Sequence, residues 1–277
     1  MRFAILIVIV ISQIVIVIAK RGEENEDISA EEQEAMGLFE GDIMTHADNW
    51  RDSLREIQRM SEGRPWNDTE GDSLPDHIRR KRGAGWNKWT NNIMPYIIDG
   101  SIGSTVRYRI LKQMDYIEDN SCIKFVKRTT ESNYVRIFKG DGCWAHPQMQ
   151  GGEQRISIGN GCGSIGTITH EIFHALGRYH EHGRIIRDEF IMVNLENVRS
   201  GYQSAFGKLK REYIHRHGLP YDFESVMHYS CCAFAKVLSE KTIIVNDRYS
   251  EFEGLIGNKQ FVTQTDMKFM NSIYECQ

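Results

Sequence analysis

Residues 170–180 read His-Glu-Ile-Phe-His-Ala-Leu-Gly-Arg-Tyr-His, a spacing that can assemble a metal site. His170 and His174 are four positions apart, so on a helix both imidazoles project from one face and can share a metal ion. Glu171 is not spaced to join them as a ligand. It flanks the same face, where a carboxylate can take a proton from metal-bound water. This part of the run therefore predicts two ligands and a general base.

The end of the run supplies a third ligand. Gly177 can adopt a positive φ and end the helix, so that the chain doubles back and delivers His180. Three neutral imidazoles with an open fourth position for water are the arrangement of catalytic zinc rather than structural zinc. The alternative is an ordinary amphipathic helix with surface histidines, but five fixed residues in this order rarely arise by chance. We therefore predict one zinc ion per subunit.

Longer motifs give this chain a family resemblance. The motif His-Glu-x-x-His-x-x-Gly-x-x-His resembles the metzincin signature, and Glu181 with Arg184 extends it to a pattern similar to the astacin family of zinc endopeptidases. The family's downstream Ser-x-Met-His-Tyr is matched at residues 225–229, and further matches lie at 120–126, 142–144 and 274–276. The similarity covers about residue 85 to the C-terminus. Arg178 departs from the pattern, because an aromatic residue is usual there, which puts local packing in question.

The resemblance implies a fold and further site residues. It implies an α+β, two-subdomain zincin (metzincin) protease, with a mixed twisted sheet, a long active-site helix above the cleft and an irregular lower subdomain. The strand that borders the cleft would be an antiparallel edge that pairs with extended polypeptide substrates. Tyr229 would ligate zinc at rest and then stabilise the oxyanion, although a buried core tyrosine is the plainer interpretation. Met227 would lie beneath the zinc site as a packing residue.

Periodicity gives a coarse view of the elements. Apolar and alternating patterns predict strands at 94–98, 122–126, 134–138 and 154–158, and a helix from 106 through 114. Ile165, Ile168, Ile172 and Leu176 form a helical stripe that should face the core, opposite the ligands. Beyond Gly177 we expect less regular structure. His182 and His228 are expected on the surface or in structural contacts.

Six cysteines in a secreted chain imply disulfides, although spacing alone leaves several connectivities open. By the resemblance, Cys122 pairs with Cys276, and Cys143 with Cys162. Cys231 and Cys232 remain and are adjacent, so their Cα atoms lie about 3.8 Å apart. That is below the usual disulfide range of roughly 4.4–6.8 Å. Thiols, a strained bridge and an intermolecular link all stay open for this pair.

Charge is distributed unevenly along the 277 residues, whose formal net charge is −4. Residues 20–82 hold 17 acidic and 10 basic residues, net −7, whereas residues 83–277 hold 21 acidic and 23 basic, net +2. A net acidic chain argues against a nucleic-acid partner. The change in net charge falls at the basic cluster 79–82. This cluster is typical of a processing site, so we predict cleavage after Arg82 by a processing protease. A heparin or nucleic-acid patch is the alternative.

The amino-terminal segments predict a secreted precursor. Residues 1–19 combine one positive charge, an apolar run and a final small residue, as in a signal peptide, with a membrane anchor as the rival. We therefore expect a signal peptide at 1–19, an acidic propeptide at 20–82 and a catalytic domain at 83–277 with no appended C-terminal modules. A glycosylation sequon at 67–69 would leave with the propeptide.

The propeptide carries its own inhibitory motif. Residues 39–42 read Phe-Glu-Gly-Asp, and the resemblance implies that Asp42 binds the zinc of the zymogen, although Gly-Asp is also common in turns. Residues 47–60 place apolar side chains at helical spacing, as in a helix that docks on the protease. After cleavage the new amino terminus would contact Glu181.

Together these features predict a secreted, extracellular zinc metalloendopeptidase, made as a zymogen with its own propeptide as inhibitor. The alternative is a catalytically silent zinc-binding protein on a protease scaffold. Such proteins usually lose the base or a ligand, whereas Glu171 and the three histidines are all present.

Overall fold

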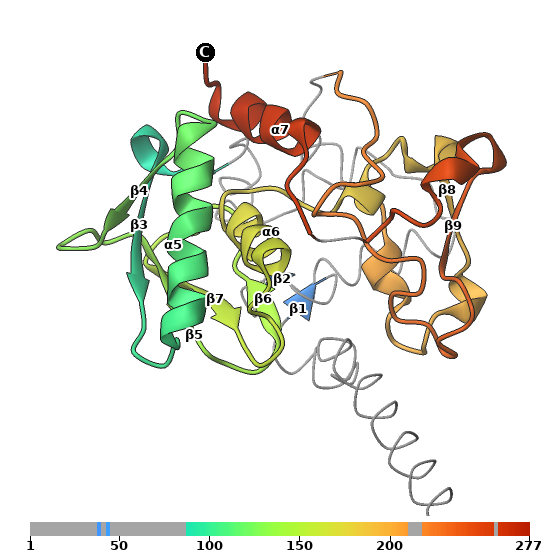
Figure 1. Cartoon of the computed structure of the whole chain (residues 1–277), viewed down its shortest axis with the longest axis horizontal. Helices are drawn as coiled ribbons and strands as arrows, with labels where there is room; N and C mark the ends of the chain where they lie inside the picture. Colours follow the sequence, from blue (N-terminus) through green and yellow to red (C-terminus); the bar gives the residue numbers. More distant parts are fainter. Residues whose placement is uncertain (1–37, 40–42, 45–86, 210–217, 258–259) are drawn as a thin grey trace, which may run out of the picture.

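The computed structural model describes residues 38–39, 43–44, 87–209, 218–257 and 260–277. A mixed sheet with helices packed on it forms one half, and a less regular region forms the other (Figure 1). The strands are β1 (Leu38–Phe39), β2 (Ile43–Met44), β3 (Ile93–Ile98), β4 (Lys124–Lys127), β5 (Tyr134–Phe138), β6 (Cys143–Ala145), β7 (Glu153–Ile158), β8 (Ile191–Val193) and β9 (Ile243–Val245). The α-helices are α5 (Ser104–Asp119), α6 (Ile165–Ala175) and α7 (Gln264–Tyr274). Short 3-10 helices are Thr90–Asn92, Glu181–Gly183, Arg187–Glu189, Leu195–Asn197, Gln203–Phe206 and Asp247–Phe252.

Within the described residues the larger sheet has the strand order β1-β2-β6-β7-β5-β3-β4. Strands β4, β3, β5 and β7 run parallel, and β6 pairs antiparallel with β7. Beyond β6 the sheet continues, because β2 pairs parallel with it, placing Ile43 opposite Ala145, and β1 pairs antiparallel with β2. The predicted mixed sheet and α+β class are confirmed.

The helices follow their apolar spacing. On α5 the buried residues Ile110, Met114 and Ile117 recur every three to four positions and form one packed face. α6 is buried almost throughout its length, and Ser164 caps it by accepting a hydrogen bond from the Thr167 amide at 3.0 Å.

The predicted apolar stripe of α6 is correct except at its first residue. Ile168, Ile172 and Leu176 are buried, whereas Ile165 is 45% exposed. Ile165 is the first residue of the helix, and its side chain faces solvent.

Two hydrophobic cores correspond to the two predicted subdomains. The first joins the sheet, α5, α6 and α7. The second is rich in aromatic residues and fills the irregular half between residues 191 and 256 around the small β8–β9 sheet. α7 begins with a capping box between Thr263 and Asp266 and returns the chain to the first core (Figure 1).

Two disulfides fasten the first subdomain. Cys122 is bonded to Cys276, which holds the chain beyond α7 to the segment after α5, and Cys143 of β6 is bonded to Cys162, just before α6. These are the two pairs that the resemblance implied. No helix in the described part of the chain is long and apolar enough to cross a membrane.

Candidate metal centre

Three histidines converge where the two subdomains meet. His170 and His174 project from α6, and His180 reaches them from the segment after the helix. The Nε2 atoms of His174 and His180 lie 3.0 and 3.2 Å from Nε2 of His170. All three side chains are fully buried. The structure thus brings together the three ligands that the motif predicted.

The turn that delivers His180 has a definite hydrogen-bond pattern. Gly177 takes φ 107°, its amide donates to the His174 carbonyl at 2.8 Å, and the Arg178 amide donates to the Phe173 carbonyl at 2.8 Å. This pair of bonds is a Schellman motif, which satisfies two carbonyls that the helix end would otherwise leave without partners. Glycine is favoured at its left-handed position because a Cβ would be strained there.

The hydrogen bonds of the Nδ1 atoms determine which ring nitrogens are available to a metal ion. Nδ1 of His170 lies 2.7 Å from the Val226 carbonyl, and Nδ1 of His174 lies 2.7 Å from the Arg178 carbonyl. A carbonyl only accepts, so both Nδ1 atoms carry protons and both Nε2 atoms present lone pairs. Tetrahedral Zn²⁺ at about 2.0–2.1 Å from each nitrogen separates its ligands by about 3.3 Å. The converging lone pairs therefore fit a zinc ion.

The other predicted site residues surround this centre. Glu171 lies on α6 between two ligands and is 1% exposed. The ring centroid of Tyr229 lies 4.6 Å from that of His180, and Met227 is fully buried in the first core. Glu171 and Tyr229 thus lie close to the histidines, and Met227 is a core residue.

His182 and His228 are buried rather than on the surface. His182 stacks on Tyr229 with ring centroids 3.9 Å apart, and its Nε2 lies 3.0 Å from the Ala205 carbonyl. His228 lies between the Tyr221 hydroxyl and the Tyr229 carbonyl, each at 2.7 Å. Burial lowers the pKa of His182 well below 6.5 and lowers the pKa of His228 to about 4, so both rings stay neutral as packing groups.

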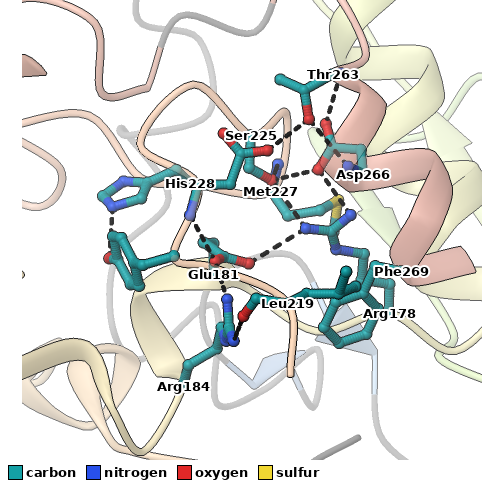
Figure 2. A network of polar contacts seen from close by, with 12 residues as sticks. Arg178, Glu181, Arg184, Leu219, Ser225, Met227, His228, Thr263, Asp266 and Phe269 are labelled. Atoms are coloured by element: carbon teal, nitrogen blue, oxygen red, sulfur yellow. Dashed lines mark hydrogen bonds and ion pairs between the residues drawn. The ribbon is translucent and has the colours of Figure 1, made fainter. Parts of the chain in front are cut away.

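Arg178 lies in a buried cluster of charges beside the centre (Figure 2). Its guanidinium contacts Asp266 of α7 at 2.6 Å and Glu181 at 3.2 Å, and it lies over the Phe269 ring at 4.6 Å. Arg184 adds a second cation on Glu181 at 2.6 Å. The aromatic position of the family pattern is thus filled by a paired cation that stacks on an aromatic ring from α7.

Asp222 lies at the edge of this cluster. Its amide donates to Glu181 at 3.0 Å, and its carboxylate accepts from Thr263 Oγ1 and from the Glu224 amide. Burial raises the pKa of Asp222 from 3.8 to about 6, and the nearby charges of Asp266 and Glu181 act in the same direction. This carboxyl group is therefore protonated more readily than a solvated aspartate.

Arg178 and Asp266 were not predicted as site residues from the sequence. The Thr-x-x-Asp spacing at 263–266 is a recognisable capping-box signal that would have located the start of α7. It would not have shown that Asp266 also reaches Arg178, because that contact joins distant parts of the chain.

Predictions upstream of residue 87 fall almost wholly outside the described residues, including Asp42, the helix at 47–60 and the cleavage site at Arg82. The described exceptions are β1 and β2, which flank residues 40–42, and β2 joins the sheet at β6. Three residues beyond β6, the Gln148 amide donates to the carbonyl of His174 at 3.0 Å. The β1–β2 pair therefore joins the sheet at β6, and the segment that follows β6 contacts the histidine helix α6.

Cys231 and Cys232 follow Tyr229 closely in the chain. Their Sγ atoms lie 3.0 Å apart, and both residues are half-buried. The Cys231 carbonyl accepts from the amides of Thr242 and Ile243 at 2.8 and 3.0 Å, which fixes this segment against β9.

Comparison with known proteins gives one consistent result. The family model named Astacin, which describes a family of peptidases, matches residues 81–275. Blastula protease 10 of Paracentrotus lividus is 33% identical over 249 residues, which cover 86% of this chain and 38% of that protein. Meprin A subunit beta of Mus musculus is 34% identical over 242 residues, 87% of this chain and 30% of that one. Zinc metalloproteinase nas-12 of Caenorhabditis elegans is 36% identical over 197 residues, 70% of this chain and 51% of that one.

The chain spans about half the length or less of these three relatives. A solved structure also matches over nearly its whole length: high choriolytic enzyme 1, a hatching enzyme zinc-protease from Oryzias latipes. It superposes with a TM-score of 0.64 at 29% identity, over 70% of this chain and 96% of that one.

Proposed function

The chain belongs to the astacin family of zinc peptidases, and on that premise we propose that it is an endopeptidase that hydrolyses peptide bonds of extracellular proteins. One observation carries this proposal. Three Nε2 atoms converge at distances that suit a shared zinc ion, and backbone carbonyls hold the outer protons of His170 and His174. A buried carboxylate, Glu171, lies between those two histidines in the helix. Ligands and base together suit hydrolysis.

The mechanism assigns each residue one task. Zinc held by His170, His174 and His180 would supply Lewis-acid polarisation of the scissile carbonyl and a lowered pKa of its bound water. Glu171 accepts the proton of the attacking water and passes it to the leaving amine. Tyr229 donates its phenolic hydrogen to the developing oxyanion.

The test replaces the base and leaves the ligands in place. Glu171→Ala is expected to reduce hydrolysis of a casein-type substrate by about 10²–10⁴-fold, while one zinc per chain is retained. Near wild-type hydrolysis by the zinc-loaded variant would contradict the assignment of Glu171. If the wild-type chain binds zinc but cleaves nothing after removal of residues 20–82, the silent zinc-binding alternative holds.

Latency is part of the proposal. A signal peptide at 1–19 would direct secretion, residues 20–82 would inhibit, and a processing protease cutting after Arg82 would release the catalytic domain 83–277. The pairing of β2 with β6 supports this, since a propeptide strand on β6 would occupy an edge that extended substrates need. Asp42 immediately precedes β2 in the chain, and would serve as the fourth zinc ligand.

Latency can be tested in the uncut precursor. Asp42→Ala is expected to allow slow hydrolysis of small peptides, because it removes a tethered ligand that has a high effective concentration at the metal. Glu40→Ala, which removes a neighbouring carboxylate, is the matched control and should stay inactive. Mass spectrometry must show that neither protein has been clipped. Equal, negligible rates in both would mean that latency is steric alone.

A further inference from the structure

Two backbone carbonyls orient the predicted zinc ligands on α6. The Arg178 carbonyl accepts the Nδ1 proton of His174, and the Val226 carbonyl accepts that of His170, each at 2.7 Å. Such outer hydrogen bonds set the tautomer and the ring orientation of a ligand, so whatever holds these two carbonyls in place also holds the metal site.

Asp266 of α7 contacts both residues that carry these carbonyls, and Figure 2 shows its contact with Arg178. One carboxylate oxygen contacts the Arg178 guanidinium at 2.6 Å, and the other accepts the Val226 amide at 3.1 Å. Ser225 reinforces the connection, because its hydroxyl donates to Asp266 at 2.6 Å and accepts from the Arg178 guanidinium at 3.1 Å. A single side chain thus fixes the two residues that carry the orienting carbonyls.

The third ligand is tied to the same cluster. Glu181, which follows His180, accepts from Arg178 at 3.2 Å through its carboxylate, and its amide donates to the Met227 carbonyl at 2.9 Å. All three histidines therefore connect to the buried charge cluster through short covalent or hydrogen-bonded paths.

This arrangement is costly if its only purpose is stability. Arg178, Asp266 and Glu181 are each at most 1% exposed, and the desolvation of buried charges can exceed what their pairing returns. Well-packed apolar side chains often stabilise such a site as much or more. Charged hydrogen bonds are directional, so they hold the backbone they bind in one geometry. Apolar contacts restrain the backbone less strictly.

We propose that Arg178 and Asp266 are positioning residues, through which α7 fixes the orientation of the zinc ligands. The inference rests on the zinc-peptidase function proposed above. It makes α7 part of the active centre although no residue of α7 is among the predicted ligands.

The experiment measures zinc affinity by competition with a chromophoric chelator, alongside the thermal stability of the zinc-free protein. Arg178→Met should weaken zinc binding about 10–100-fold, the usual cost of losing an outer-shell partner. Arg178→Lys should recover part of the loss, because an ammonium can still pair with Asp266 but cannot also bridge Ser225 and Glu181. In the active protein kcat should fall with zinc in excess, because the ligands remain misoriented.

Two further variants make the result decisive. Arg178→Met leaves the Asp266 charge buried without its partner and can impair folding. The double variant Arg178→Met/Asp266→Asn, which removes both charges, is therefore measured as well. It should fold and still bind zinc weakly. Arg136→Met is the control: it removes the cation of the Arg136–Asp99 ion pair on the sheet, away from the buried cluster. This variant should bind zinc nearly as tightly as wild type.

Zinc binding by the folded double variant equal to that of wild type would overturn the proposal, as would an equal loss in Arg136→Met. Failure of the wild-type chain to bind zinc at all would instead overturn the proposed function, so the two failures are distinguishable.

Discussion

Tyr229 is held beside the metal centre by two aromatic neighbours, stacked on His182 and 4.6 Å from the His180 ring. Tyr229→Phe keeps this packing and deletes only the hydroxyl. If the hydroxyl stabilises the oxyanion, kcat should fall by about 10²–10³ while KM changes little. Steady-state kinetics on a peptide substrate give both constants. Tyr134→Phe removes a hydroxyl bonded to Glu153 on the sheet and should leave kcat unchanged; the same result for Tyr229→Phe would mean a packing role.

Asp222 gives the molecule a testable pH dependence. Its pKa is raised from 3.8 to about 6, so the folded state binds this proton more tightly than the unfolded state does. Its contribution to stability is therefore complete below pH 3.8 and is lost as the pH rises through about 6. Asp222→Asn removes the titration. The difference in Tm between variant and wild type should then shift in favour of the variant as the pH rises from about 4 to about 7.

A matched variant separates this effect from general changes in surface charge. Asp247 is exposed, and Asp247→Asn should keep a nearly constant Tm difference from wild type across the same range. Parallel pH profiles for the Asp222 and Asp247 variants would contradict a specific role of the buried carboxyl group.

At the scale of the elements, α6 depends on how it ends. Gly177 at φ 107° forms the turn that brings His180 to the other two ligands. Gly177→Ala places a Cβ in a left-handed conformation, which should lower the free energy of unfolding by about 1–2 kcal/mol. Zinc affinity should fall as well, because the turn carries both the third ligand and the Arg178 carbonyl. Chemical denaturation of the zinc-free protein and chelator competition measure the two effects.

Gly254→Ala is the control for that substitution, since an added Cβ there meets nothing within 4 Å. Its stability and zinc affinity should match those of wild type. A Gly177→Ala protein as stable as the Gly254→Ala protein would show that the turn tolerates a side chain.

Elements were predictable where one local pattern decided them. β5 follows strand alternation, β3 is a short apolar run, and the buried stripe of α6 follows helical spacing. The spacing of the three histidines likewise predicted that they would converge. α7 was missed because its signal, the capping box at Thr263, is short. His182 and His228 were expected on the surface or in structural contacts. Their burial is made favourable by surrounding aromatic rings and by hydrogen-bond partners from distant parts of the chain.

At the scale of the whole molecule, the less predictable features are those that join distant segments. The orienting groups of the ligands are backbone carbonyls, which have no signature in the sequence. The contact of Arg178 with Asp266 depends on the return of α7 to the first core, and the Cys122–Cys276 bond fastens the end of that helix. The three converging histidines could therefore be predicted from residues 170–180, whereas the contacts that orient them become visible only in the complete fold.

The buried charge cluster around Arg178 and Glu181 also affects what happens when the propeptide is removed. The resemblance implied that the new amino terminus pairs with Glu181, but that carboxylate already accepts from Arg178, Arg184 and the Asp222 amide while 1% exposed. Two arginines already pair with Glu181 and Asp266, so these two carboxylates do not need a further ammonium as partner. We therefore expect activity to depend on departure of the propeptide and not on the exact first residue.

The test compares mature chains that begin at Gly83 with chains that carry two extra residues ahead of it, both released by an engineered cleavage site in place of residues 79–82. Their kcat/KM values on one small peptide should agree, because Arg178 already supplies the cation that Asp266 and Glu181 require. Arg178→Met lacks that cation. In this variant the chain that begins at Gly83 is expected to have a higher kcat/KM than the extended chain, because only its terminal ammonium would pair with Glu181 as the resemblance implies. A tenfold or greater advantage of the Gly83 form in the wild-type background, about 1.4 kcal/mol, would show that the amino terminus is needed as well and that Arg178 does not replace it.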